Sequence, residues 1–156
     1  MKILIAVDSS EDSRQAIEVI AGRPRRPGTE AKIIHVVESA VPPLPDLMGV
    51  GAEAARREHD VAVSEGHELL NEMAEKIRGA SDDGFHIETE IITAGYKQSP
   101  EQVIVEEAER FDADLVMVGS RGTSGWKRAI LGSVSAAVVQ HAPCSVEVVR
   151  KKSSRH

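Results

Sequence analysis

Residues 114–135 read Asp-Leu-Val-Met-Val-Gly-Ser-Arg-Gly-Thr-Ser-Gly-Trp-Lys-Arg-Ala-Ile-Leu-Gly-Ser-Val-Ser, so an apolar run is followed by spaced glycines and then by serines. The apolar run 114–118 has the composition of a buried strand, and a helical pattern begins at Ser133. Glycine lets the backbone come close to an anion, and the free N–H groups and dipole at a helix start favour a phosphate. The stretch therefore predicts a strand, a phosphate-binding loop and a helix in succession.

Apolar runs and helix-start signals alternate along the rest of the chain. The run 3–7 is continuous, as expected for a strand covered on both faces, and the polar residues 8–11 can cap a helix. Ser99, Pro100 and Gln102 form another helix start, because the serine can cap, proline suits the first turn, and the glutamine can reach back to the cap amide. The pattern predicts strands at 3–7, 31–37, 86–92, 114–118 and 145–149, and helices after residues 8–11 and at 52–78, 100–111 and 133–141.

This alternation indicates a single α/β domain with a parallel sheet and right-handed crossovers. Ligands of such sheets bind beyond the carboxyl ends of the strands, where the strand order reverses. Residues 42–51 are rich in proline and glycine, which predicts a long loop that serves as a passive connection, as a lid or as a partner site. The connector 23–27, Arg-Pro-Arg-Arg-Pro, is densely basic, and the sequence assigns it no role.

Composition narrows the function classes. The chain has 156 residues, enough for one domain with its own core, which we expect over 1–150 with a disordered basic tail over 151–156. A net charge of −6 and an aromatic content of 3% disfavour binding to nucleic acid or to an anionic membrane. No apolar segment approaches the roughly 20 residues that a membrane-spanning helix needs. Cys144 is the only cysteine, so no internal disulfide forms and the cytoplasm is the expected compartment.

Two common nucleotide-binding motifs do not fit the glycine loop. A Walker A loop needs a lysine followed by serine or threonine directly after its last glycine, but Trp126 follows Gly125 and Ser133 follows Gly132. A dinucleotide-binding fingerprint follows the first strand, whereas here the glycines follow the fourth. A P-loop NTPase and an NAD-type enzyme are therefore both disfavoured.

The spacing Gly-x₂-Gly-x₉-Gly-Ser, between a Val-Met-Val strand and a helix, resembles the nucleotide-binding signature of the universal stress protein family. The resemblance covers nearly the whole chain. It implies a Rossmann-like domain of the adenine nucleotide alpha hydrolase-like type, with five parallel strands in the order 3-2-1-4-5 and helices on both faces. It also implies a homodimer and bound ATP. The segments that carry it, besides the loop, are Lys2–Ser10, Ile34–Val37, Ala113–Ser120 and Arg128–Val134.

The same resemblance implies a binding site. Its glycines and serines would surround the phosphates and ribose, and residues from the first two strands would lie near the nucleoside. Asp8 would accept hydrogen bonds from ribose hydroxyls or hold the Mg²⁺ that accompanies the phosphates. Apart from the resemblance, the basic loop residues Arg121, Lys127 and Arg128 are candidates to meet a triphosphate, although exposed basic residues in a loop are usually solvated. The candidate binding residues are Ala6, Asp8, Val36, Gly119, Arg121, Gly122, Gly132, Ser133, Val134 and Ser135.

Simpler interpretations stand beside these. The glycines can serve a βα turn alone, and Asp8 can be the cap of the first helix. Ser9 and Ser10 fit helix caps better than nucleophiles, and His35 fits a hydrogen-bonded position within a strand. The histidines lack the spacing of metal ligands, so we expect no metal site beyond Mg²⁺ carried by a nucleotide.

One departure from the family pattern bears on assembly. The family's last strand often reads Cys-Pro-Val-Leu-Val-Val, and Glu147 stands here at a position that is usually apolar. Because last strands commonly pair across the dimer in this family, we expect the carboxylate to weaken or shift that pairing.

The sequence supports three functional hypotheses. The first is a cytoplasmic ATP-binding protein that acts as a nucleotide-dependent switch in a stress response or in signalling. The second is a slow ATPase or phosphotransferase that uses the same pocket; it is disfavoured because no lysine or histidine accompanies the signature as an evident phosphate clamp or base. The third is a partner-binding module without nucleotide.

Overall fold

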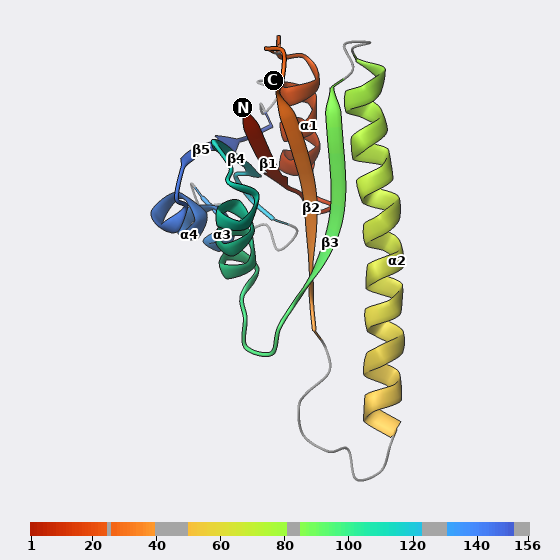
Figure 1. The fold of residues 1–156 in the computed structure, drawn as a ribbon. Helices are drawn as coiled ribbons and strands as arrows, with labels where there is room; N and C mark the ends of the chain where they lie inside the picture. Colours follow the sequence, from red (N-terminus) through yellow and green to blue (C-terminus); the bar gives the residue numbers. More distant parts are fainter. Residues whose placement is uncertain (25, 40–49, 81–84, 123–130, 152–156) are drawn as a thin grey trace, which may run out of the picture.

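The computed structural model describes residues 1–24, 26–39, 50–80, 85–122 and 131–151. Strands and helices alternate along the chain, as the sequence predicts (Figure 1). The long loop expected at 42–51 falls mostly outside the described residues. The elements are β1 Lys2–Ala6, α1 Glu11–Ala21, β2 Glu30–Glu38, α2 Val50–Gly79, β3 His86–Ala94, α3 Pro100–Phe111, β4 Leu115–Gly119, α4 Ser133–His141 and β5 Ser145–Val149.

All five strands form one parallel sheet in the order β3-β2-β1-β4-β5, which confirms the order that the family resemblance implies. Ala6, the last residue of β1, pairs with Ile34 of β2 and with Val118 of β4. β2 and β3 run on together to the pair Glu38 and Ala94. The chain moves outward from β1 in one direction to β3 and then in the other direction to β5, so the strand order reverses between β1 and β4.

Helices cover both faces of the sheet. α1 and α2 lie on one face and α3 and α4 on the other (Figure 1). Alternate residues of β1 serve the two sides, since Ile3 and Ile5 join the cluster under α1 and α2 while Leu4 joins the cluster under α3 and α4. This is why the sequence of β1 is continuously apolar rather than alternating.

The helix starts use the residues that the sequence indicates. Ser10 caps α1, and its hydroxyl accepts a hydrogen bond from the Ser13 N–H at 3.2 Å. Pro100 opens α3, and Gln102 Oε1 accepts from the Ser99 N–H at 2.9 Å. Among the described residues, no helix is both long enough and apolar enough to cross a bilayer.

Arg23 of the basic connector reaches Glu147 on β5. One guanidinium nitrogen of Arg23 donates to the two carboxylate oxygens at 2.7 and 2.9 Å, and this bond raises the pKa of Arg23. Glu147, which departs from the family pattern, is therefore the partner of Arg23, and this contact gives one arginine of the basic connector a structural role. The ion pair fastens the end of α1 to the outermost strand.

Lys32 of β2 is a buried charge, with only 3% of its surface exposed. Its Nζ lies 2.9 Å from Glu107 and 3.2 Å from Glu88, and it also contacts Glu90. Burial would lower the pKa of Lys32, but its hydrogen bonds to Glu90, Glu107 and Glu88 outweigh burial and raise it. Arg110 donates to Glu107 and Glu90 as well, so the network ties β2, β3 and α3 together.

Replacing Lys32 by methionine is expected to lower the free energy of unfolding by about 3 kcal/mol, because Glu107 stays buried with one cation fewer. Urea denaturation at neutral pH measures the change. Lys76→Met is the matched control, since the Lys76 pair with Glu18 is exposed and its loss is expected to cost less than about 1 kcal/mol. Equal losses of unfolding free energy in the two variants would show that the Lys32 network stabilises the fold no more than an exposed ion pair does.

The network also predicts a pH dependence. The hydrogen bond from Lys32 lowers the pKa of Glu90 below its ordinary 4.5 in the folded state. The stability from that ionised carboxylate is fully present above pH 4.5 and is lost as the pH falls through the lowered value. The difference in the free energy of unfolding between the wild type and Lys32→Met should therefore narrow as the pH falls below 4.5 and Glu90 becomes protonated. A difference that stays constant over this range would show that the ionised Glu90 does not contribute.

Candidate functional site

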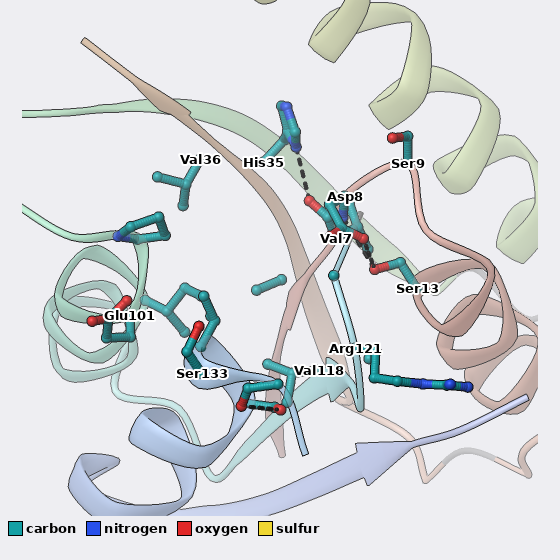
Figure 2. A pocket seen from close by; sticks show the side chains of 18 of the residues that line it. Val7, Asp8, Ser9, Ser13, His35, Val36, Glu101, Val118, Arg121 and Ser133 are labelled. Carbon is teal, nitrogen blue, oxygen red and sulfur yellow. Dashed lines mark hydrogen bonds between the residues drawn. The ribbon is translucent and has the colours of Figure 1, made fainter. Parts of the chain in front are cut away.

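A cavity of about 610 Å³ opens at the carboxyl ends of β1, β2 and β4, where the strand order reverses. Its lining comes from the strand ends, the loop after β4 and the first turns of α3 and α4 (Figure 2). The structure brings together around it every candidate binding residue that the sequence predicts. These are Ala6, Asp8, Val36, Gly119, Arg121, Gly122, Gly132, Ser133, Val134 and Ser135.

Asp8 lies two residues after the end of β1, but it does not cap α1, because Ser10 takes that position. One oxygen of Asp8, Oδ1, accepts from the Ser10 N–H at 3.0 Å and from the Ser13 hydroxyl at 2.7 Å. These bonds hold the carboxylate in a turn that joins β1 to α1. The other oxygen, Oδ2, lies 3.0 Å from where a Cβ on Gly122 would stand. The Asp8 carboxylate is therefore held in one position next to Gly122 in the loop that follows β4.

The glycines of the loop have different surroundings. A Cβ on Gly119 would lie 2.9 Å from the Ser13 backbone nitrogen and 3.1 Å from the Asp12 carbonyl carbon, so the first turn of α1 packs directly on that residue. A Cβ on Gly122 would approach only the end of the Asp8 side chain. Packing explains the glycine at 119, whereas the glycine at 122 borders the cavity next to a carboxylate.

The two serines of α4 also differ. Ser135 is buried, and its hydroxyl lies 3.0 Å from the carbonyl oxygens of Ser120 and Gly132. Its hydroxyl thus joins the two ends of the loop. Ser133 is exposed in the first turn of α4 and faces the cavity (Figure 2). A helix start of this kind presents free N–H groups, which suit an anion.

Arg121 lines the cavity, but its side chain points away from Val118 and Ser133 (Figure 2). Its Nε lies 3.3 Å from Oδ2 of Asp12, the second residue of α1. Lys127 and Arg128, the other basic residues expected to meet a triphosphate, lie outside the described residues. Within the described lining, the arginine is thus directed away from the space that it was expected to serve.

Asp12 was missed by the sequence analysis. It is 3% exposed, and it accepts from the Ser120 hydroxyl at 2.6 Å and from the Lys151 N–H at 2.9 Å. Burial would raise the pKa of Asp12, but the hydrogen bonds from Ser120, Lys151 and Arg121 outweigh burial and lower it. Lys151, expected in a disordered tail, is held by this bond and by an ion pair with Glu11.

Several lining residues carried no signal in the sequence. His35 belongs to β2, and its Nδ1 lies 2.8 Å from the Val7 carbonyl oxygen, so it is hydrogen-bonded as expected but also borders the cavity. Its ring fits because α2 has a glycine opposite, where a Cβ on Gly66 would lie 2.8 Å from His35 Cδ2. The strand residues among them reach the cavity because the strand pairings align the carboxyl ends, whereas Pro100, Glu101 and Ile104 reach it from the start of α3. The unpredicted lining residues are Val7, Ser9, Ser13, His35, Glu38, Pro100, Glu101, Ile104 and Val118.

The lining of the cavity has an apolar part and an acidic part. Val36, Ile104 and Val118 give an apolar wall, while Glu38 and Glu101 add carboxylates to that of Asp8. In the described parts of the chain, no group of three or more histidine, cysteine, aspartate or glutamate side chains is placed to hold a metal ion. The cavity can take a ligand with a flat apolar part and a phosphate.

The model of the universal stress protein family matches residues 1–150. The chain belongs to the universal stress protein family. Universal stress protein YxiE of Bacillus subtilis is 33% identical over 155 residues, which cover 96% of this chain and 98% of that protein.

Solved structures of the family share the fold. Universal stress protein UspA from Lactobacillus plantarum is 26% identical, with a TM-score of 0.69, and the match covers 96% of this chain and 97% of that one. Hypothetical protein MJ0577 is 25% identical, with a TM-score of 0.74 and coverage of 98% and 97%. More distant family structures include one in complex with cAMP, 19% identical, and one from Archaeoglobus fulgidus in complex with dAMP, 21% identical.

The glycines at 119 and 122 are expected to respond differently to alanine. Gly119→Ala should lower the free energy of unfolding by about 2 kcal/mol, because its Cβ meets backbone that can move only if α1 shifts. Gly122→Ala should lower it by less than about 1 kcal/mol, because its Cβ meets a side-chain end. Chemical denaturation compares them with Gly79→Ala, whose Cβ would have no atom within 4 Å. Equal losses at 119 and 122 would contradict the difference in packing between the two glycines.

Proposed function

We propose that this chain binds an adenine nucleotide, with ATP as the first candidate, in the cavity at the carboxyl ends of β1, β2 and β4. The observation that carries the proposal is the convergence of the loop Ser120–Gly122, the start of α4 and the end of β1 on one cavity of about 610 Å³. That volume is within the range of small-molecule sites. The cytoplasm is the compartment that we propose for this activity.

In this proposal, different residues contact the base, the ribose and the phosphates. Val36 and Ile104 pack against the base, and Asp8 Oδ2 accepts from ribose hydroxyls or binds Mg²⁺ that accompanies the phosphates. Gly122 leaves room for the phosphates beside Asp8, since a side chain there would stand 3.0 Å from the carboxylate. The N–H groups at Ser133 receive a phosphate at the start of α4.

The family structures in complex with cAMP and with dAMP support an adenine nucleotide as the ligand class. Both ligands carry one phosphate, so monophosphates belong in the test beside ATP. We further propose that the bound nucleotide acts as a signal in a stress response, which requires that the nucleotide favour one of two conformations or assemblies.

We infer that two copies pair through β5, the outermost strand beside β4. The Val149 carbonyl accepts from the Ser120 N–H at 2.7 Å, so the peptide groups of Val149 face inward. Because backbone groups alternate in direction along a strand, those of Val148 face the open edge. Glu147 projects from a face of the sheet to Arg23, and we propose that it therefore leaves the edge accessible to a second copy.

The nucleotide proposal predicts binding that depends on residue 122. Freshly purified protein is denatured and the released small molecules are chromatographed; stripped protein is then titrated calorimetrically with ATP, ADP, AMP and cAMP, with and without Mg²⁺. We expect micromolar affinity for at least one of them. Gly122→Val should weaken it by at least about tenfold, because the branched side chain enters the space beside Asp8. Gly79→Ala, at the far end of α2, should bind as the wild type does.

The outcomes separate the three functional hypotheses. Absence of both bound nucleotide and measurable affinity would overturn the nucleotide proposal and leave a partner-binding module. Steady hydrolysis that is abolished by Asp8→Ala would instead identify an ATPase. Binding without turnover supports the switch.

The pairing proposal predicts a mass of two chains in light scattering. Val148→Pro should give a single chain with an unchanged circular dichroism spectrum, because it removes an N–H that faces the edge and no hydrogen bond to β4. Glu147→Gln should leave the mass of the pair unchanged. A pair that survives Val148→Pro would place the interface elsewhere.

A further inference from the structure

From the first turn of α1, Asp12 binds three residues in two other parts of the chain. Its Oδ2 accepts from the Ser120 hydroxyl at 2.6 Å and from Arg121 Nε at 3.3 Å, and its Oδ1 accepts from the Lys151 N–H at 2.9 Å. Ser120 and Arg121 begin the loop that borders the cavity, and Lys151 follows β5. The carboxylate therefore joins the cavity loop to the segment that leaves the last strand.

The three hydrogen bonds that Asp12 accepts differ in length. The bonds from Ser120 and Lys151 have ordinary lengths, whereas that from Arg121 is long for a hydrogen bond between nitrogen and oxygen. The Asp12 side chain is 4% exposed and that of Arg121 is 36% exposed. Arg121 is thus the partner that can leave with least disturbance, because two donors stay on the buried carboxylate when it goes.

We propose that Asp12 and a phosphate in the cavity compete for Arg121, so that Asp12 sets how strongly the site responds to phosphate charge. The proposal rests on the proposed nucleotide site and adds its regulation. Arg121 lines the cavity while its Nε contacts Asp12, so rotation of the side chain exchanges one anionic partner for the other.

The competition for Arg121 determines whether Asp12 raises or lowers the affinity for a ligand that carries phosphate. A ligand phosphate gains Arg121 only by breaking the ion pair with Asp12, so the net gain is the difference between the two pairings. Adenosine has no phosphate and gains nothing from the exchange. Each added phosphate in AMP, ADP and ATP increases the attraction on Arg121, and the opposing pull of Asp12 lowers the affinity for these ligands.

The exchange also reaches the end of the chain. Lys151 and Arg121 bind the same carboxylate, and Arg150 Nε donates to the Ser120 hydroxyl at 3.2 Å. Departure of Arg121 changes the charge beside the Lys151 N–H. The segment after β5 therefore senses whether the cavity holds a phosphate.

The experiment compares Asp12→Asn with the wild type by titration with adenosine, AMP, ADP, ATP and inorganic pyrophosphate. Asparagine keeps one acceptor oxygen for the Lys151 N–H and turns its NH2 group to the Ser120 hydroxyl, which can accept instead of donate, while the charge that holds Arg121 is removed. We expect ATP and pyrophosphate to bind about fivefold more tightly and adenosine to bind unchanged. Arg121→Gln in the Asp12→Asn background should abolish that gain.

Glu72→Gln is the matched control, because it makes the same change of charge and releases an arginine of α1, Arg14, from its ion pair. It should leave every affinity unchanged. In the wild type, the Lys151 amide resonance should move on addition of pyrophosphate, and it should not move in Arg121→Gln. This second readout holds even where Asp12→Asn fails to fold.

The results distinguish the inference from the proposed function. Nucleotide affinities that are the same in the wild type and Asp12→Asn, or a gain that includes adenosine, overturn the competition and leave the site. Tighter pyrophosphate binding in Asp12→Asn with no nucleotide binding in any variant supports the competition and overturns the nucleotide proposal. A wild-type Lys151 resonance that pyrophosphate leaves unmoved also overturns the competition.

Discussion

The close packing of the first turn of α1 on the end of β4 is the constraint on which the site depends. It requires the absence of a side chain at Gly119, since a Cβ there would stand 2.9 Å from the Ser13 backbone nitrogen. This contact sets the turn after β1, in which Asp8 is bound by Ser10 and Ser13. It also brings the loop after β4 over Asp8. The part of the cavity wall that Asp8 and Gly122 form therefore follows from how closely α1 approaches β4.

Two buried charges stabilise the fold in different ways. Lys32 is surrounded by carboxylates and further linked through Arg110, a network that belongs to the structure away from the cavity. Asp12 is held by a hydroxyl and a backbone N–H, with one longer bond to an arginine. A charge that is satisfied by neutral donors can change its cationic partner at lower cost than one that relies on ion pairs alone. This difference is why Asp12, and not Lys32, is suited to regulate a ligand.

Features that depend on neighbours in sequence could be predicted, and features that depend on distant pairs could not. The cap and proline at Ser99 and Pro100 lie within one turn of the helix that they start, and the local hydrophobic pattern predicts all five strands, by apolar runs or by alternation. The pair of Arg121 with Asp12 joins residues 109 apart, and that of Arg23 with Glu147 joins residues 124 apart. No local pattern indicates such a pair, because it depends on the strand order and the register of the sheet. Glu101 and His35 reach the cavity for the same reason.

The two ends of the cavity differ in what they can recognise. The loop after β4 and the start of α4 offer backbone N–H groups and glycines, which suit a phosphate without regard to what it is attached to. The other end is made by side chains of β2 and α3, among them Val36, Glu38 and Glu101. Carboxylates there favour a ligand with hydrogen-bond donors, such as the amino group of a purine, and disfavour additional negative charge. The spacing of the glycines therefore predicts a phosphate site. In the function that we propose, the choice among nucleotides depends on residues from β2 and α3 and on the competition between Asp12 and the ligand for Arg121.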